Sequence, residues 1–470
     1  MDTKKLRQKI LDLAIRGKLV PQDPNDEPAS VLLERIRAEK EQLIKEGKIK
    51  RSKKSAATDK SHYENVPFEI PESWVWTSIG ELFEHNTGKA LNASNRDGKM
   101  MDYITTSNLY WDRFDLSVVK QMLFTEEELW RCTAKKGDLL ICEGGDIGRA
   151  AIWNYDYDIR IQNHIHRLRG YKGINHRFYY FVFLLYKLSN RIGGKGVAIQ
   201  GLSSGDLHKL EVPLPPEYEQ IRLVKTIEKW FKFVDLLEQE QENLHTLAQS
   251  TKSKILDLAI SGKLVSQDPN DEPAIELLKR INPDFKPCDN SHYENLPENW
   301  CLAKVKDVFV INPRNKAEDN TIAGFIPMTL IDDGYSNTFS YEKRKWGSIK
   351  TGFTHFANGD VAVAKISPCL ENRKSIVLRD LPNGIGAGTT ELHVFRSSVV
   401  VPEYALYFFK SEYFISKCVG TFNGVVGQQR VGKNIIEEIQ IPIPPINEQT
   451  KIVSTIETIF TQLNTITAEL

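Results

Sequence analysis

The chain has 470 residues, of which 41% are hydrophobic and 26% are charged, which is typical of globular proteins and leaves room for roughly two to four domains. Lys and Arg total 62, as do Asp and Glu, so a uniformly basic molecule is excluded and any nucleic-acid surface must be a local patch. The six cysteines lack Cys-x-x-Cys spacing, no apolar run reaches the length of a membrane span, and no signal-peptide pattern follows Met1. Together these features predict a cytoplasmic protein.

One segment of 21 residues occurs twice. KILDLAIRGKLVPQDPNDEPA at 9–29 returns as KILDLAISGKLVSQDPNDEPA at 254–274, with 19 of 21 positions identical and an offset of 245 residues. Solenoid repeats are roughly 20–50 residues long, so this period indicates two domain-sized bodies separated by repeated connectors. A second motif, Pro-Pro-x-x-Glu-Gln, begins at Pro215 and again at Pro444.

Residues 1–61 are predicted to hold a helix that ends near Gly17, followed by a charged linker. Residues 62–216 form the first body. Short β-rich runs such as Asp138–Cys142, together with an apolar helix near His176–Ser189, indicate a mixed α/β domain here.

Residues 217–291 are predicted to form a long central helix and a second linker. Apolar residues between 223 and 258 follow an alternating spacing of four and three, which is the seam of a coiled coil. As a single helix this stretch would be about 54 Å long. Gly262 lies where a glycine that caps a helix C-terminus is expected.

Residues 292–445 form the second mixed α/β body, with the run Asp360–Ala364 and an apolar helix near Pro402–Cys418. Residues 446–470 begin a second copy of the central helix, and the start of the chain matches the other half. We therefore expect an α+β protein whose two bodies are joined by a long antiparallel pair of repeated helices, pseudo-twofold and circularly permuted. The predicted seam consists of Leu223, Ile227, Trp230, Val234, Leu237, Ile452, Ile456, Ile459, Leu463, Ile466, Leu6, Ile10 and Leu13.

Catalytic motifs are scarce. Asn282–Phe285 lacks the second proline of an adenine methyltransferase loop, and Gly384–Gly388 lacks the helix that follows a cofactor-binding turn. Glu143–Arg149 lacks the Gly-Lys-Ser/Thr ending of a P-loop. The sequence therefore predicts no catalytic residue, no metal site and no cofactor in this chain.

Polar clusters suited to nucleic acid occur in both bodies. Ile161–Arg169 alternates polar and apolar residues, which predicts a strand with amide, imidazole and guanidinium groups on one face. Lys195–Ser204 and Gly427–Lys433 combine small residues with hydrogen-bond donors, as loops that read a DNA groove do. Asn, Gln and Arg can bind base edges, and basic residues bind phosphates. The candidate DNA-binding residues are Arg149, Asn163, His164, His166, Arg167, Lys195, Gln200, Ser203, Ser204, Lys365, Arg373, Lys374, Gln428, Gln429, Arg430 and Lys433.

The runs GDLLICEGGDIGRAAIW and IQNHIHRLRG, followed by LHKLEVPLPPEYEQIRLVKTIE, resemble the specificity subunit of type I restriction-modification systems. GQQRVGKNIIEEIQIPIPPINEQTKIVSTIE repeats the signature, so the resemblance covers nearly the whole chain. It implies two target recognition domains, each reading half of a split double-stranded DNA target. It also implies coiled-coil helices that act as a spacer and dock two methyltransferase subunits.

The resemblance further implies that S-adenosylmethionine binds to the methyltransferase partners, while the presence of two motor-nuclease restriction subunits stays open. The leading hypothesis is a non-catalytic, sequence-specific DNA-binding subunit and scaffold without membrane contact. The alternative, a self-contained DNA methyltransferase or nuclease, requires a cofactor loop or a carboxylate-lysine metal site that the sequence does not display. A coiled-coil protein without a DNA role would leave the two unlike bodies unexplained.

Overall fold

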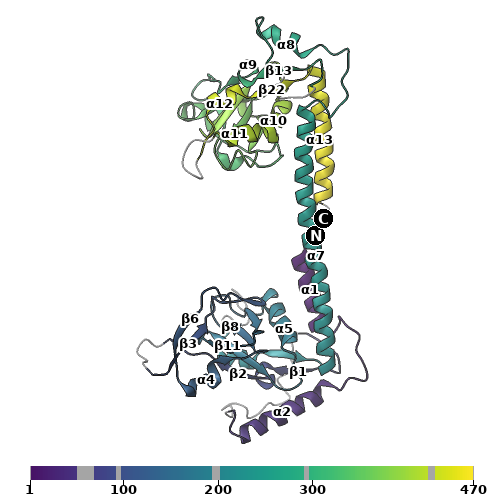
Figure 1. The fold of residues 1–470 in the computed structure, drawn as a ribbon, viewed down its shortest axis with the longest axis vertical. Helices are drawn as coiled ribbons and strands as arrows, with labels where there is room; N and C mark the ends of the chain where they lie inside the picture. Colours follow the sequence, from purple (N-terminus) through teal and green to yellow (C-terminus); the bar gives the residue numbers. More distant parts are fainter. Residues whose placement is uncertain are drawn as a thin grey trace. The chain divides into compact units, whose positions relative to one another are not determined.

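The computed structural model describes residues 2–49, 68–91, 97–192, 202–289, 296–421 and 429–468. It divides into two compact units, Met1–Gln239 and Glu240–Leu470, and the boundary falls within the long helix α7 (Glu217–Ile260). Each unit has the same order of parts: a leading helix, a mixed α/β body and a trailing helix (Figure 1). The first part of α7 is the trailing helix of unit 1, and its second part is the leading helix of unit 2.

The body of unit 1 is built on two four-stranded sheets, with strand orders β6-β3-β10-β7 and β2-β11-β8-β9, and β1 pairs with β12 beside the helices. The strands are β1 (Val75–Ser78), β2 (Phe83–Thr87), β3 (Lys99–Ile104), β4 (Leu109–Tyr110), β5 (Arg113–Phe114), β6 (Lys120–Phe124), β7 (Thr133–Ala134), β8 (Leu139–Cys142), β9 (Ala150–Ile152), β10 (Ile159–Ile161), β11 (Ile165–Gly170) and β12 (Glu211–Leu214). The helices before α7 are α1 (Thr3–Ile15), α2 (Ala29–Lys45), α3 (Ile79–Leu82), α4 (Glu126–Cys132), α5 (His176–Leu188) and α6 (Ser204–Lys209).

The body of unit 2 repeats this plan, with sheets ordered β14-β21-β18-β19 and β16-β15-β20-β17 and a pair β13-β22 beside the helices. The strands are β13 (Cys301–Lys304), β14 (Val310–Ile311), β15 (Ile322–Ile326), β16 (Glu342–Lys345), β17 (Thr354–Ala357), β18 (Val361–Ala364), β19 (Ser375–Val377), β20 (Ile385–Gly388), β21 (Leu392–Arg396) and β22 (Gln440–Ile443). The helices after α7 are α8 (Ala274–Ile281), α9 (Val305–Val308), α10 (Pro402–Lys410), α11 (Glu412–Val419), α12 (Lys433–Glu438) and α13 (Ile446–Ala468).

The central strand of each body is buried on both faces. In β8, Leu139 and Ile141 pack toward α5, whereas Leu140 and Cys142 pack against the second sheet. Successive side chains of a strand point to opposite faces, so four consecutive apolar residues are needed where both faces are covered. β18 is likewise buried on both faces in unit 2. Val361 and Val363 pack toward the helices, whereas Ala362 and Ala364 pack against the second sheet. Both runs were predicted as strands, and both are strands.

The apolar helix predicted near His176–Ser189 is present as α5. The one predicted over Pro402–Cys418 is wrong as a single helix, because it is divided into α10 and α11 at Ser411. Ser411 has extended backbone angles, φ −69° and ψ 152°, and its side chain accepts a hydrogen bond from the Phe414 backbone N–H as an N-cap. A serine that satisfies a free N–H starts a new helix rather than continuing the old one.

Each copy of the repeated connector ends its leading helix with a glycine. Gly17 has φ +68°, and the backbone N–H groups of Gly17 and Lys18 donate to Ala14 O and Leu13 O, which is the Schellman arrangement. Gly262, with φ +71°, repeats this arrangement, so the predicted cap is confirmed. A side chain at either glycine would also collide with a proline ring, Pro71 in unit 1.

A buried carboxylate joins three distant segments of unit 1. Glu219 is 1% exposed, and its Oε2 accepts from Trp74 Nε1 at 2.9 Å while its Oε1 accepts from Gln22 Nε2 at 2.6 Å. The adjacent Gln220 accepts from the Asn175 backbone N–H at the start of α5. The Pro-Pro-x-x-Glu-Gln motif therefore ties the trailing helix to both the connector and the body.

The same three segments are joined in unit 2. Glu448 is 2% exposed and accepts from Trp300 Nε1 at 2.9 Å and from Gln267 Nε2 at 3.0 Å. Gln449 accepts from the Val401 backbone N–H, next to the start of α10. Because each copy of the connector binds the trailing helix of its own unit, the 21-residue repeat serves one packing task twice.

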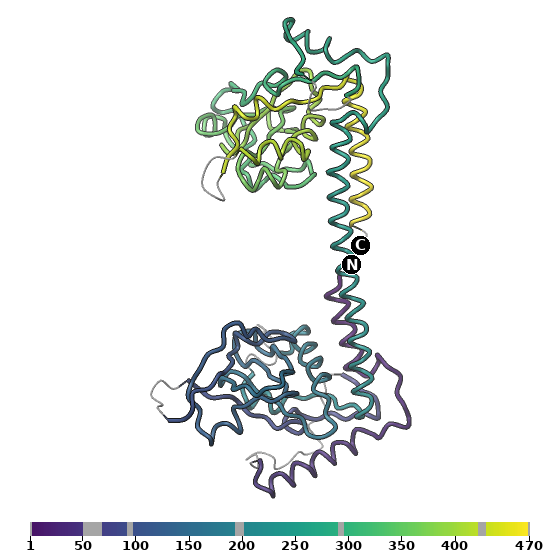
Figure 2. The backbone as a smooth tube through the Cα atoms, in the orientation of Figure 1, coloured from purple at the N-terminus to yellow at the C-terminus, as the bar shows by residue number. Residues whose placement is uncertain are grey.

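The leading and trailing helices pack antiparallel within each unit (Figure 2). In unit 1, Arg7 near the start of α1 binds Asp235 at 2.5 Å, whereas Gln22 beyond its end binds Glu219. In unit 2 the corresponding pair is Lys252 with Asn464, at 2.6 Å. The antiparallel pairing expected from the repeated, permuted helices is therefore present in both units.

Part of the predicted seam is exposed. Leu223, Ile227 and Val234 are buried, but Trp230 is 48% and Leu237 40% exposed. A straight helix has 3.6 residues per turn, so positions repeating every 3.5 drift about 20° around it per heptad. In unit 2, Ile452 and Ile456 are buried, Ile459 and Leu463 are partly buried, and Ile466 is 50% exposed, which is the same drift. Assigning Trp230, Leu237 and Ile466 to a buried seam was therefore wrong.

Helix α1 turns a different face to the core from the one predicted. Ile10 is buried, but Leu6 and Leu13 are only partly so, and the most buried residues are Leu11 and Ile15. The reason is that α1 packs on the body and on α7 together, which requires a wider apolar stripe than a two-helix seam. In the part of the chain that the structure describes, no helix combines the length and apolar character needed to cross a membrane.

We expect Trp74→Phe to lower the free energy of unfolding of unit 1 by about 1–3 kcal/mol, because one oxygen of the buried Glu219 carboxylate then loses its donor. Trp300→Phe should have the same effect in unit 2. Hydrogen exchange of the backbone amides of α1 and α13 measures each unit separately.

The matched control is Trp76→Phe. Trp76 Nε1 is buried and has no hydrogen-bond partner among the described residues, so its removal leaves no acceptor unsatisfied. Equal destabilisation by Trp76→Phe and Trp74→Phe would contradict the role given to the hydrogen bond.

Candidate nucleic-acid interface

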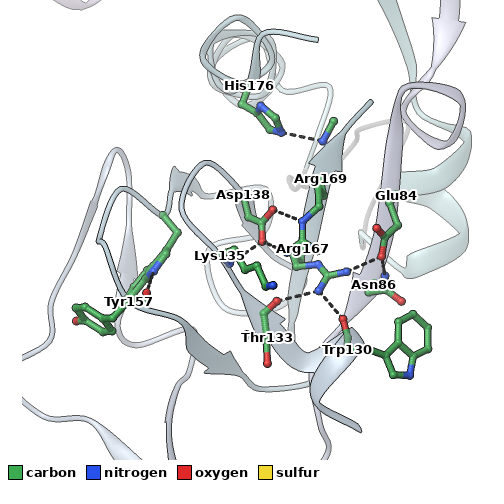
Figure 3. A network of polar contacts seen from close by, with 12 residues as sticks. Glu84, Asn86, Trp130, Thr133, Lys135, Asp138, Tyr157, Arg167, Arg169 and His176 are labelled. Atoms are coloured by element: carbon green, nitrogen blue, oxygen red, sulfur yellow. Dashed lines mark hydrogen bonds and ion pairs between the residues drawn. The ribbon is translucent and has the colours of Figure 1, made fainter. Parts of the chain in front are cut away.

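A bidentate ion pair fixes the two central strands of the first body (Figure 3). Asp138, which precedes β8 and is 2% exposed, accepts from Arg169 Nε at 2.8 Å and Arg169 Nη2 at 2.7 Å. Its Oδ2 also accepts from the Lys135 backbone N–H at 2.7 Å. These donors satisfy the buried carboxylate and connect β8 to β11, so the two strands are held in one register.

The second body contains the same ion pair. Asp360, 1% exposed, accepts from Arg396 Nε at 2.7 Å and Arg396 Nη2 at 2.8 Å, and from the Ala357 backbone N–H at 2.7 Å. The two Gly-Asp pairs noted in the sequence, at Gly137 and Gly359, thus begin equivalent strands that are locked in the same way.

A buried histidine lies three residues before each of these arginines. His166 is fully buried, with Nδ1 3.0 Å from His85 Nε2 and Nε2 2.8 Å from Leu202 O. His393 is 4% exposed, with Nε2 3.3 Å from Val431 O. Burial lowers the pKa of His166 and lowers that of His393 to about 4. Both rings are therefore neutral. His166 connects β11 to the segment before α6, and His393 connects β21 to the segment before α12.

The prediction that Ile161–Arg169 forms one alternating strand is wrong. β10 ends at Ile161 and β11 begins at Ile165, with Asn163 and His164 in a turn between them. The turn is held by backbone bonds to Lys89, whose N–H donates to Ile161 O and whose O accepts from Asn163 N–H, both at 3.0 Å. Because of the turn, the alternation shifts and different side chains face inward.

Arg167 and His166 consequently do not face DNA as predicted. Arg167 is fully buried, where it donates to Trp130 O at 2.9 Å, Thr133 O at 2.8 Å and the Glu84 carboxylate at 2.7 Å (Figure 3). Burying a charge is costly unless it is paired and hydrogen-bonded, and these partners supply that compensation. Arg167 therefore ties α4 and β2 to β11.

Polar side chains project where β8 ends and β11 begins. The exposed His164 lies with Nδ1 3.4 Å from the Glu143 carboxylate, and the Glu143 N–H donates to His164 O at 2.9 Å. Asn163 Nδ2 lies 3.4 Å from His164 Nε2. We call Glu143, Asn163 and His164 the tip of the first body. It offers an amide, an imidazole and a carboxylate, all of which can bind base edges.

The second body carries different groups at the same backbone positions. The Lys365 N–H donates to Glu391 O at 2.9 Å, as the Glu143 N–H does to His164 O. The Glu391 carboxylate accepts from Arg430 Nε at 2.8 Å and Nη2 at 2.9 Å, and this guanidinium lowers the pKa of Glu391. We call Lys365, Glu391 and Arg430 the tip of the second body. The tip of the first body thus carries a carboxylate, an amide and an imidazole, whereas the tip of the second body carries a lysine, a carboxylate and an arginine.

Two predicted residues of the second body stabilise the fold. Arg373 Nε donates to Lys410 O at 3.0 Å, and Nη2 binds Glu412 at 2.8 Å. Lys374 Nζ donates to Ile331 O at 2.7 Å. These contacts hold part of each side chain within the fold, and direct contact of either residue with DNA stays a prediction.

Arg149 of the first body is also engaged within the fold. Its Nη2 donates to Thr106 O at 2.6 Å, and its guanidinium carbon lies 5.1 Å from the centroid of the Tyr110 ring. Its Nε is buried without a partner among the described residues. Part of the Arg149 side chain is thus used within the fold, and its direct contact with DNA stays a prediction.

The remaining predicted residues lie in or near α6 and α12 or outside the described chain. Ser203 caps α6 by accepting from the Asp206 backbone N–H, and Ser204 is exposed in its first turn. Lys433, in the first turn of α12, lies 3.3 Å from Glu437. Gln429 accepts from the Ser367 backbone N–H through its own carbonyl. Lys195, Gln200 and Gln428 lie outside the described residues.

Sequence reasoning missed Glu143 and Glu391. Both are acidic, whereas hydrogen-bond donors were expected to contact DNA. Their positions in the sequence were the available signal. Glu143 directly follows the apolar strand β8, and Glu391 directly precedes β21, the strand that pairs with β18. The described residues contain no group of three or more His, Cys, Asp or Glu side chains placed to hold a metal ion.

Known proteins are similar to this chain in sequence and in fold. The model of the type I restriction modification DNA specificity domain matches residues 71–246 and 297–470. The chain is similar to the type I restriction enzyme EcoEI and EcoAI specificity subunits of Escherichia coli, with 40% identity over 220 residues and 42% over 218. These matches cover 43% and 42% of this chain, and 37% of each relative's length.

A solved structure gives a likeness of fold over a longer stretch. It is described as the structural basis of complex assembly and conformational transition of the type I R-M system, and it superposes with a TM-score of 0.53 at 16% identity. The superposition covers 86% of this chain and 94% of that chain.

We expect His164→Ala to weaken DNA binding by roughly 3- to 10-fold without changing the melting temperature, because the ring is exposed and one or two hydrogen bonds would be lost. His166→Ala should instead lower the free energy of unfolding by about 1–3 kcal/mol, because it leaves Leu202 O without its buried donor. Fluorescence anisotropy and thermal unfolding measure the two effects. Loss of stability in His164→Ala would assign the tip to the fold.

We expect the stability of unit 2 to fall as the pH drops from 6.5 towards 4. The folded state holds the pKa of His393 at about 4, against an ordinary value of 6.5, so in this window the unfolded chain binds a proton that the folded chain refuses. One such proton changes the free energy of unfolding by at most about 1.4 kcal/mol per pH unit. Hydrogen exchange of β21 amides between pH 7 and 4.5 should give a flatter profile for His393→Gln. His245→Gln, on the exposed surface of α7, is the matched control; equal profiles for wild type and His393→Gln would contradict the assignment.

Proposed function

The chain belongs to the type I restriction modification DNA specificity domain family, and from this premise we propose that it reads a bipartite, asymmetric DNA target. Each unit reads one half of the target. The chain itself catalyses no reaction; it positions methyltransferase subunits, which methylate adenine with S-adenosylmethionine as the methyl donor. Where a restriction subunit is present, it joins the same complex.

The observation that carries this proposal is the contrast between the repeated scaffold and the two tips. Asp138 with Arg169, and Asp360 with Arg396, lock equivalent strands in equivalent registers. At the ends of those strands the two units carry different polar side chains. Glu143 and His164 of unit 1 correspond to Lys365 and Glu391 of unit 2. A scaffold that keeps its ion pair while its tip differs presents two chemically distinct surfaces to DNA, and two such surfaces suit two different half-sites.

Neutral net charge supports a role within a complex. Affinity for DNA depends largely on neutralised phosphates, and 62 basic residues are balanced here by 62 acidic ones. We therefore propose that two methyltransferase subunits supply much of the phosphate binding. The complex acts in the cytoplasm.

The long helix offers a surface to those partners. Trp230, Phe233 and Leu236 of α7 are each about half exposed, at 48%, 48% and 50%. Trp230 and Phe233 lie with ring centroids 5.9 Å apart. Exposed aromatic and aliphatic side chains on one stretch of helix are typical of docking surfaces, so the exposure of this patch supports the role of α7 in holding the methyltransferases.

We expect replacement of residues 62–216 by the equivalent body of a relative to change one half of the methylated target and leave the other half unchanged. The reason is that the contacts to base edges lie within one body. Mapping of methylated adenines in DNA, after co-expression with the methyltransferase partner, measures the result.

The reciprocal replacement of residues 292–445 is the matched control and should change the other half only. A change of both halves by either replacement, or of neither half by both, would contradict independent reading by the two units.

A further inference from the structure

A basic cavity of about 270 Å³ lies between α1 and the end of α5 in unit 1. Its wall contains Lys5, Lys9 and Arg16 from α1 and Arg191 from the segment after α5. The other lining residues are Gln8, Asp12, Phe68, Leu185 and Ser189. Four cations and one carboxylate therefore face one space, and none of them belongs to the tip of the first body.

Two of the four cations lack a carboxylate partner. Arg16 binds Asp12 at 2.8 Å, and Lys5 lies 3.3 Å from Asp2. Neither Lys9 nor Arg191 forms an ion pair with any residue that the structure describes. Among the residues that the structure describes, the cavity thus carries more positive than negative charge.

An aromatic ring organises two of these cations. The guanidinium carbons of Arg16 and Arg191 lie 4.9 Å and 5.2 Å from the centroid of the Phe68 ring. Arg191 also lies 5.3 Å from the centroid of Tyr186. Stacking orients guanidinium groups but does not neutralise them, so both groups can still bind an anion in the cavity.

The second unit lacks this set of cations although its connector is nearly identical. At the offset of 245 residues, Lys5 and Arg16 correspond to Ser250 and Ser261, while Lys9 corresponds to Lys254. Arg16 is one of the only two residues that differ between the 21-residue copies. Arg16 therefore distinguishes the connector of unit 1 from that of unit 2, and its side chain lines the cavity.

We propose that this cavity binds a phosphate group of the DNA backbone. This inference rests on the proposed function. Paired guanidinium groups bind phosphate oxygens through directed hydrogen bonds, and Lys9 adds a point charge. A volume of 270 Å³ holds a phosphate with several waters, since a water takes about 30 Å³. The contact would be made by unit 1 only, and it would position DNA without reading a base.

The test uses the full chain in complex with its methyltransferase partner. Lys9→Gln combined with Arg191→Gln should weaken cognate and non-cognate DNA to the same degree, by roughly 10-fold at 0.15 M salt, and make the dependence of log affinity on log salt shallower by about 1. Arg191→Lys, which keeps the charge, should recover part of the affinity. Lys254→Gln is the matched control, and it should bind DNA with the wild-type slope.

Duplexes that each carry one uncharged methylphosphonate locate the contact. At one backbone position this change should weaken the wild-type complex and have no further effect on the double variant. A wild-type slope for the double variant, with equal melting temperatures, would overturn the inference while the domain-replacement result still stands.

Two other outcomes also decide the matter. If the double variant keeps wild-type DNA binding but loses the binding of tripolyphosphate, the cavity takes a free polyphosphate and the assignment to DNA is overturned. If the wild-type complex shows no preference for any DNA sequence, the proposed function fails first, and this inference fails with it.

Discussion

The buried carboxylate at the start of each trailing helix is the interaction on which the rest of each unit depends. Glu219 accepts hydrogen bonds from Trp74 and Gln22, which lie after and before α2 in the sequence. Burial raises the pKa of Glu219, and these donors oppose that effect. A carboxylate removed from water is tolerated only with such donors, so the connector, the body and the trailing helix must meet at this point. The repetition of 19 of 21 connector residues follows from the need to build this meeting point twice.

Each body contains two kinds of polar residue. Residues of the first kind are buried and repeated, such as Asp138 with Arg169 and the histidines His166 and His393. Residues of the second kind are found at the strand ends and differ between the units. The strands bring Glu143 against His164 in one unit and Lys365 beside Glu391 in the other. Rigid scaffolds that carry unlike strand-end groups are a physical way for one chain to bind two unlike half-sites.

The same division explains the errors in the candidate site. Arg167 was expected to contact DNA because arginine often does, but it donates to Trp130 O, Thr133 O and Glu84. None of these partners is near Arg167 in the sequence, and no local pattern reveals them. Alternation along Ile161–Arg169 also failed as a guide, because backbone bonds to Lys89 create a turn in the middle of the run. Tertiary contacts of this type decide which side of a strand faces the solvent.

The sequence by itself determined the two-unit plan, the central strands, the long helix with its glycine cap, and the family, because each of these is written in residues close together or in an outright repeat. Only the tertiary structure decided which polar groups are free. It buried His166 while leaving His164 exposed, and it left Trp230 outside the seam because a straight helix departs from a heptad repeat. It also gathered Lys9 of α1 and Arg191 beyond α5 around one cavity. Local order depends on neighbours in the chain, whereas exposure depends on contacts between distant segments.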